Sequence, residues 1–152
     1  MEQNKEQLMV AALENGSVID HIPTDKLFTI VQLLQLDKFN NEVIIANNLD
    51  SKVMNRKGLI KISEKFFTED EISQLAVVCP KIKLTVIRNF KVVEKREINL
   101  PGTLINIVKC ANPVCITNNE PMRTYFNIHN ATRTAKCRYC GKEQSLDNIK
   151  LK

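Results

Sequence analysis

Four cysteines near the end of the chain have the spacing of a metal site. Cys110 and Cys115 are separated by four residues, 21 residues follow, and Cys137 and Cys140 are separated by two. Two close pairs, each in a tight turn, bring four thiolates to a tetrahedron, and soft sulfur ligands in that geometry favour Zn²⁺. Four protein ligands leave no open position for water. The pattern therefore predicts one structural zinc ion per chain.

The four-cysteine pattern has one alternative interpretation, and Cys79 and His129 are not expected to bind the metal. Four free or redox-active cysteines are the alternative to the zinc site, although paired spacing is specific for metals. Cys79 stands apart and is expected to be a buried apolar residue. His129 lies near the cysteines but off their spacing, so we expect a surface or core histidine rather than a fifth ligand.

Catalytic chemistry has little support in the residues. Asp20 and His21 form the one neighbouring acid–histidine pair, and adjacent strand residues point to opposite faces, so the two are expected to be poorly placed to act together. The chain has four glycines and no glycine-rich phosphate loop or nucleophile motif. We therefore expect a chain without catalytic residues.

Lysines on predicted strands offer a binding chemistry. Lys57 and Lys61 are four residues apart and share one face of a strand, whereas Ile60 and Ile62 take the other face. Lys95 lies on a later strand. Lysines aimed from a sheet face neutralise phosphates as point charges. A solvated strand face is the alternative, and the pattern by itself does not select a nucleotide.

The elements that carry these residues predict an α+β domain with a ferredoxin-like order. Strand, helix, strand, strand, helix and strand follow one another with one additional strand, which leaves one sheet face for a ligand or partner. The expected strands are 17–22, 42–47, 53–65 with a bulge or bend at Gly58, 83–88 and 91–98. The expected helices run from an N-cap at Thr24 to about Leu36, and from Thr68 to Pro80.

A break at Leu100-Pro101-Gly102 divides the chain into two predicted domains, 1–100 and 101–152. The first carries 14 Lys/Arg and 14 Asp/Glu, whereas the second carries 8 Lys/Arg and 3 Asp/Glu and accounts for the net charge of +5. Short strands are expected at 104–108, 125–129 and around Lys136. A basic module of this kind suits an acidic protein surface or a nucleic acid.

The sequence contains neither a predicted membrane helix nor a predicted signal peptide. No apolar run approaches the roughly 20 residues of a membrane helix, and the first ten residues have no signal-peptide core. We therefore expect a cytoplasmic protein with no membrane partner.

The chain resembles the regulatory chain family of aspartate carbamoyltransferase. The resemblance rests on Val18-Ile19-Asp20-His21-Ile22-Pro23, on 55–62 (NRKGLIKI) and on the four cysteines, which match the family's zinc ligands. It implies a non-catalytic subunit of pyrimidine biosynthesis that forms homodimers and bridges catalytic trimers. It also implies that an allosteric domain binds CTP and ATP in one pocket, that UTP acts with CTP, and that the zinc domain contacts the catalytic chain.

The resemblance also implies which residues contact the effector. The matched positions are Val10, Ala12, Leu13, Val18, Asp20, His21, Lys57, Lys61, Ile87, Val92 and Lys95. Residues 10–13 line the base pocket, 18–21 run beside the base, ribose and phosphates, and Ile87 and Val92 are walls around the base. Lys61 approaches the ribose and is linked to discrimination between nucleotides.

The phosphate side of that site is carried by basic residues. The resemblance places His21, Lys57 and Lys95 near the phosphates. Ala11, Thr85 and Phe90 depart from the acidic residue, asparagine and tyrosine of well-known enteric members. Each lost hydrogen bond shifts discrimination by about 1 kcal/mol.

Two other functions remain as alternatives. A nucleic-acid-binding zinc ribbon would use the basic second domain, although Tyr125, Phe126 and Tyr139 offer few stacking surfaces there. An enzyme would have to use Asp20 and His21. We expect no nucleic-acid partner.

Overall fold

The computed structural model describes residues 13–152. These residues form two compact units. The first contains the residues up to Thr68 together with Val78–Ile98, and the second contains Glu69–Val77 and Asn99–Lys152. Each unit has its own sheet and its own buried apolar residues, so each is described separately.

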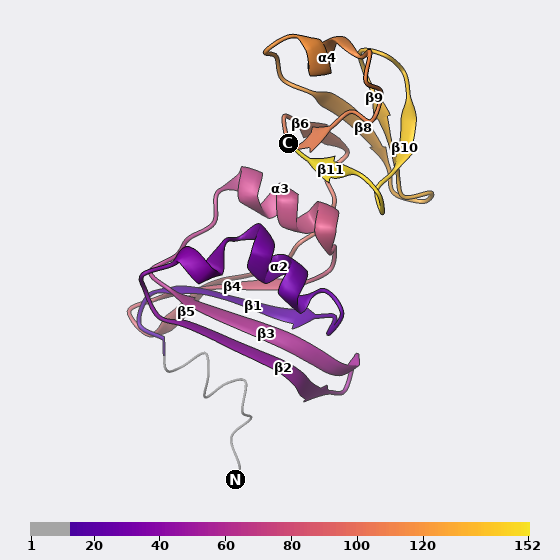
Figure 1. The fold of residues 1–152 in the computed structure, drawn as a ribbon. Helices are drawn as coiled ribbons and strands as arrows, with labels where there is room; N and C mark the ends of the chain where they lie inside the picture. The colour runs from indigo at the N-terminus through magenta and orange to yellow at the C-terminus, as the bar shows by residue number, and fades with distance from the viewer. Residues whose placement is uncertain (1–12) are drawn as a thin grey trace. The chain divides into compact units, whose positions relative to one another are not determined.

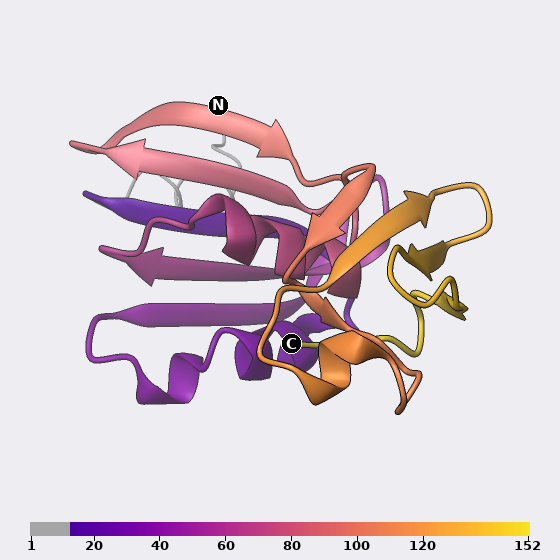
Figure 2. The same ribbon diagram turned by 90° about the horizontal axis from the view of Figure 1, so that it is seen from above.

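A five-stranded antiparallel sheet forms the framework of the first unit. Its strands are β1 (Gly16–Ile22), β2 (Val43–Ser51), β3 (Asn55–Ser63), β4 (Lys83–Arg88) and β5 (Lys91–Glu97). They lie in the order β2-β3-β1-β4-β5, with the indigo strand β1 at the centre in Figure 2. β1, the first of the described strands, therefore contributes to the middle of both faces.

One face of this sheet is apolar and is covered by α2 (Leu27–Leu33), as Figure 1 shows. Ile19 lies directly opposite Ile60, and both are fully buried. Gly58 lies beneath the helix, where an added Cβ would stand 2.9 Å from a methyl carbon of Leu27. The sequence predicted a bulge or bend at this glycine; β3 is continuous through it, and its missing side chain lets the helix lie close to the sheet.

The helices differ from the prediction mainly at their starts and ends. The Lys26 amide donates to the Pro23 carbonyl in a separate turn, so α2 begins at Leu27 and Thr24 is not its N-cap. Gln35 has a left-handed backbone with φ of 52°, which ends the helix before a short 3₁₀ turn, η1 (Leu36–Lys38). The second predicted helix is α3 (Glu69–Val78), and Cys79 is buried just beyond its end.

The strands on either side of β3 each contain a bulge. The register of β1 with β3 shifts between Ile19 and Ile22, and that of β2 with β3 shifts between Ala46 and Leu49. Because β2 continues past its bulge, it reaches Ser51 rather than ending at Asn47 as predicted. The predicted start of β3 at Val53 is wrong because 52–54 form the turn of the hairpin, and β3 begins at Asn55.

The second unit is rich in short strands. Its four-stranded sheet has the order β10-β9-β8-β6, and β7 pairs with β11. The strands are β6 (Thr103–Ile105), β7 (Val108–Lys109), β8 (Tyr125–His129), β9 (Thr134–Cys137), β10 (Glu143–Ser145) and β11 (Lys150–Leu151), and α4 (Ile116–Asn119) is a single turn. Phe126, Val108 and Ala135 are fully buried in its core beside the cysteines.

Among the described helices, none is both long and apolar enough to cross a membrane.

Candidate functional site

The four cysteines of the second unit converge on one point. Their Sγ atoms all lie within 4.8 Å of one another. Cys110 Sγ is 3.6 Å from Cys140 Sγ, and Cys115 Sγ is 3.8 Å from Cys137 Sγ. A tetrahedral Zn(Cys)₄ site with Zn–S bonds of about 2.3 Å has sulfur–sulfur separations of about 3.8 Å. The donor set and its spacing therefore fit a four-coordinate metal ion.

Two hydrogen-bonded turns hold these cysteines in place. The Cys115 amide donates to the Asn112 carbonyl at 3.0 Å, and the Asn118 side chain donates to the carbonyls of Cys110 and Asn112. In the second turn the Gly141 amide donates to the Cys137 carbonyl, and Gly141 has φ of 77°, which favours glycine. The metal-binding turns are thus fixed by hydrogen bonds that do not involve the thiols.

The environments of the thiols differ strongly. Burial raises the pKa of Cys110 to about 12 and also raises the pKa of Cys137. The pKa of Cys140 is lowered to about 6, chiefly by a hydrogen bond from the backbone of Lys142. Thiolates crowded into a buried cluster repel one another, and a divalent cation at their centre removes that penalty.

The face of the large sheet away from α2, here called the open face, carries a row of polar and apolar side chains across four strands. Lys61 of β3 lies opposite Val18 of β1, Val18 lies opposite Thr85 of β4, and Thr85 lies opposite Lys95 of β5. Directly opposed residues share a face, so the register alone places both lysines on the same side. Lys61 is 6% exposed, whereas Lys95 is exposed.

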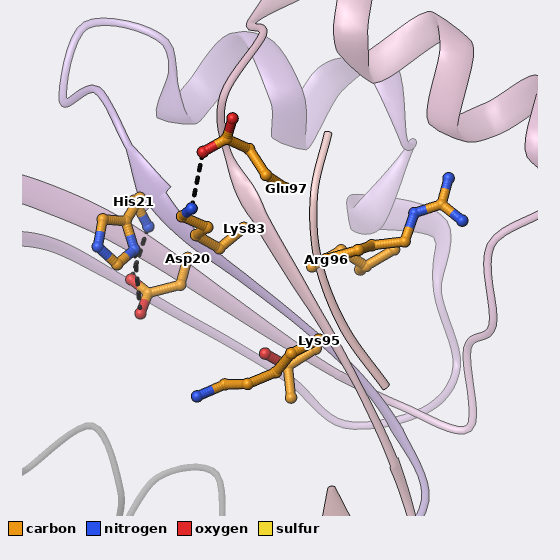
Figure 3. A pocket seen from close by; sticks show the side chains of 8 residues that line it. Asp20, His21, Lys83, Lys95, Arg96 and Glu97 are labelled. Carbon is orange, nitrogen blue, oxygen red and sulfur yellow. Dashed lines mark hydrogen bonds and ion pairs between the residues drawn. The ribbon is translucent and has the colours of Figure 1, made fainter. Parts of the chain in front are cut away.

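A charged cluster lies at the end of this row, where β1 bulges. His21 has φ of 61°, and its Nδ1 lies 3.6 Å from Asp20 Oδ2, as drawn in Figure 3. Lys57 Nζ lies 3.0 Å from Asp20 Oδ1. The expectation that Asp20 and His21 point to opposite faces is therefore wrong, because the left-handed residue interrupts the alternation of the strand.

Two hollows open beside this cluster and share His21 as a wall. One, of about 350 Å³, is also lined by Asp20, Lys83, Thr85 and Lys95 among other residues. Figure 3 shows Lys95 extending toward the side of Asp20 and His21, whereas Arg96 points the other way. The second hollow, of about 540 Å³, lies against the β2–β3 hairpin, where it also contacts Lys57.

Two family models match successive parts of this chain. A family model for the allosteric domain of the aspartate carbamoyltransferase regulatory chain matches residues 8–99, and a model for its metal-binding domain matches residues 102–150. The chain belongs to the aspartate carbamoyltransferase regulatory chain family. It is thus a regulatory, non-catalytic subunit with an allosteric and a metal-binding domain, and its partner is a catalytic chain.

Relatives along the whole length carry the same description. The aspartate carbamoyltransferase regulatory chain of Phocaeicola vulgatus is 54% identical over 99% of this chain and 98% of its own length. That of Bacteroides fragilis is 52% identical over 99% of both chains. That of Pyrococcus horikoshii is 38% identical over 94% of this chain and 96% of its own.

The structure gathers on the open face the described residues that were predicted to contact an effector. Leu13, Val18 and Ile87 belong to one buried apolar cluster, and Val92 lies opposite Ile87 on the edge strand. Asp20, His21 and Lys57 form the charged cluster, and Lys61 and Lys95 stand in the cross-strand row. Lys61 lines neither of the two hollows. Val10 and Ala12, also predicted to contact the effector, lie outside the described residues.

Several contacts of these sites had no signal in the sequence. The ion pair between Asp20 and Lys57 joins residues 37 apart, and Asp20 lies within the segment where the register of β1 with β3 shifts. Lys83 and Glu97 line the smaller hollow, although sequence reasoning gave them no role. A strand register fixes such neighbours, and register cannot be read from one strand alone.

Proposed function

We propose that this regulatory chain binds the nucleoside triphosphates CTP and ATP, and UTP with CTP, on its open face. The observation that carries the proposal is the combination on one sheet face of an apolar cluster with several basic side chains. A nucleotide has the same division, since its base is flat and weakly polar and its phosphates are anionic.

The apolar part of the face suits the base. Leu13, Val18, Leu59 and Ile87 form a cluster in which each side chain is at most 4% exposed, with Leu49 packed against it. Ligand pockets are mostly apolar with a few placed polar groups. Thr85, also buried, adds a hydroxyl beside Val18 in the cross-strand row.

The basic part of the face suits the phosphates. Lys57 and Lys61 are 1% and 6% exposed, which is rare for lysine unless it serves a partner or a ligand. This burial argues against the alternative of a simply solvated strand face for these two residues. His21 of β1 and Lys95 of β5 line the smaller hollow, whereas Lys57 lines the larger one.

The second unit is proposed to bind structural Zn²⁺ through its four cysteines and to present a surface to the catalytic chain. Beside the metal-binding turns, Val114 is 82% exposed, Ile116 51% and Tyr139 49%. Exposed apolar side chains grouped on a small module are typical of protein contact surfaces. We propose that regulatory-chain homodimers bridge catalytic trimers through these surfaces.

The finer features of fold and location belong to the same proposal. The element order and the sheet order β2-β3-β1-β4-β5 support a ferredoxin-like domain over 1–100 with an added edge strand, followed by a zinc domain over 101–152. Four thiols that are arranged for a metal, and not as disulfides, support a reducing compartment such as the cytoplasm.

The nucleic-acid alternative has less support from side-chain placement. Phe126 is fully buried, and the ring of Tyr125 is covered by the Arg138 guanidinium at 4.6 Å. Among the three aromatic residues considered for stacking, Tyr139 alone is exposed. One aromatic ring is a small platform for single-stranded bases.

Calorimetric titration of the zinc-loaded chain with CTP, repeated in the presence of ATP, tests the effector proposal. Saturable CTP binding that ATP weakens is the expected result. Lys95→Ala should weaken CTP binding, whereas Lys38→Ala, which changes an exposed lysine of η1, should leave it unchanged. CTP and ATP binding independently, or equal affinities for the two variants, would refute a shared site on the open face.

A further inference from the structure

The smaller hollow on the open face contains a lysine–glutamate pair that the effector site as described does not use. Lys83 Nζ lies 2.7 Å from Glu97 Oε2, and both side chains line the hollow with His21 and Lys95. Figure 3 shows the pair beside Asp20. We propose that Lys83 is a further phosphate-binding residue, an inference that rests on the proposed nucleotide site. Glu97 neutralises Lys83 until a polyphosphate displaces the Glu97 carboxylate.

The strand register places Lys83 next to the predicted phosphate contacts. Lys83 of β4 lies directly opposite Asp20 on one side and Glu97 on the other. Lys95 is two residues before Glu97 on the same strand, so it is the diagonal neighbour of Lys83. Diagonal neighbours on one sheet face have Cα atoms about 7–8 Å apart, within reach of each other's long side chains. One polyphosphate chain can therefore contact both ammonium groups.

The pair is weak enough to be exchanged. The side chains of Lys83 and Glu97 are 45% and 40% exposed. An ion pair exposed to this extent contributes about 0–1 kcal/mol, because water screens it and two long side chains lose freedom. Its disruption by a ligand therefore costs little, and the released carboxylate can remain hydrated.

The charge balance of the hollow favours this exchange. Asp20 is already paired with Lys57, and Lys83 is paired with Glu97. A triphosphate brings several negative charges and many acceptor oxygens, whereas Glu97 offers one charge. Charge-assisted hydrogen bonds to phosphate are among the stronger polar contacts in proteins. The contact with the phosphates thus stabilises the Lys83 ammonium more than the contact with Glu97 does.

The exchange predicts selectivity for the length of the phosphate chain and not for the base. The contribution of Lys83 should be largest for a triphosphate, smaller for a diphosphate and close to zero for a monophosphate. The apolar cluster that is proposed to hold the base lies elsewhere on the face and contains no part of the Lys83–Glu97 pair.

The test measures affinities of CTP, CDP and CMP for the intact zinc-loaded chain at constant ionic strength. Lys83→Ala should weaken the affinity for CTP about threefold to tenfold, as expected for one charged contact. It should change the affinity for CMP less than twofold. Glu97→Gln should raise the affinity for CTP about twofold or more. In the double variant, Glu97→Gln should have no further effect, because Glu97 acts through Lys83.

Lys91→Ala is the matched control, since it removes an exposed lysine from the far end of β5. The proposal is overturned if Lys83→Ala binds CTP like the unsubstituted chain, if Lys91→Ala weakens CTP equally, or if Glu97→Gln weakens it. If the unsubstituted chain binds CTP and Lys83→Ala is silent, the effector site stands without Lys83. Failure of the unsubstituted chain to bind any of the three nucleotides would remove both proposals.

Discussion

Lys57 and Asp20 form a nearly buried ion pair at the bulge of the central strand. Lys57 Nζ lies 3.0 Å from Oδ1 and 3.2 Å from Oδ2 of Asp20, and the two side chains are 2% and 16% exposed. A lysine at this depth depends on its carboxylate, because an unpaired buried charge is costly. The pair therefore supports the fold as well as the proposed phosphate site.

Removal of one charge of this pair should destabilise the first unit. Lys57→Met keeps most of the apolar stem and leaves Asp20 without its cation, which should cost about 2–4 kcal/mol of unfolding free energy. Asp20→Asn should also destabilise, and the double variant should lose at least about 1 kcal/mol less than the sum. Urea unfolding monitored by circular dichroism measures these values. Lys52→Met, in the exposed hairpin turn, is the control, and strictly additive losses would contradict the coupling.

Removal of the metal should unfold the second unit and leave the first folded. Its core is small and surrounds the cysteines, so metal binding, which contributes roughly 10 kcal/mol in small zinc modules, supplies much of its stability. Cys137→Ser should lose metal, backbone amide protection in 99–152 and assembly with the catalytic chain. Cys79→Ala should keep one zinc ion per chain. Normal assembly of a metal-free chain would contradict the prediction.

Metal affinity should fall as the pH is lowered. Burial raises the pKa values of Cys110 and Cys137, so both thiols are protonated at pH 7 without metal and must release protons on binding. Because all four ligands bind as thiolates, at least two protons are released and the affinity falls at least about a hundredfold per pH unit. Below pH 6 the slope should steepen, because Cys140, with a pKa of about 6, also becomes protonated. Competition with a chelator of known proton affinity measures the slope; a pH-independent affinity would exclude this protonation scheme.

Gly58→Ala should destabilise the first unit by crowding the helix above it. The added Cβ would lie 2.9 Å from Leu27 Cδ1, and Leu27 is fully buried. Overpacking of this kind costs about 1–3 kcal/mol. Gly102→Ala is the control, since nothing lies within 4 Å of its added Cβ. Equal stability of the two variants in thermal unfolding would show that α2 adjusts freely.

The metal site was predictable because its signal is local. Each cysteine pair lies within one turn, so spacing alone specified Cys110, Cys115, Cys137 and Cys140, and the four sulfurs converge as expected. Strand β8 (Tyr125–His129) was also predicted with its observed bounds, since its alternation is regular. The short strands β10 and β11 were missed, because polar segments of two or three residues have no periodicity to detect.

On the proposed effector face, the resemblance predicted which residues take part but not how they are arranged. The resemblance supplied the residues, and the register of β1, β3, β4 and β5 explains why the described ones share a face. The contact between Asp20 and His21 was not predictable, because it requires a left-handed backbone at a histidine. The end of α2 was missed for the same reason at Gln35, since neither residue is the glycine that usually marks such a conformation.

The central position of β1 has a consequence for the folding of the open face. Gly16 pairs with Ser63 on one side and with Ile87 on the other, so β1 has partners that are synthesised well after it. Contacts between residues so distant in sequence form slowly, because the chain must close large loops first. A nascent or truncated chain that ends before β4 would contain Val18, Asp20 and Lys61 but no finished effector surface. The proposed nucleotide site is thus a feature that the polypeptide acquires late, after β4 and β5 have been made.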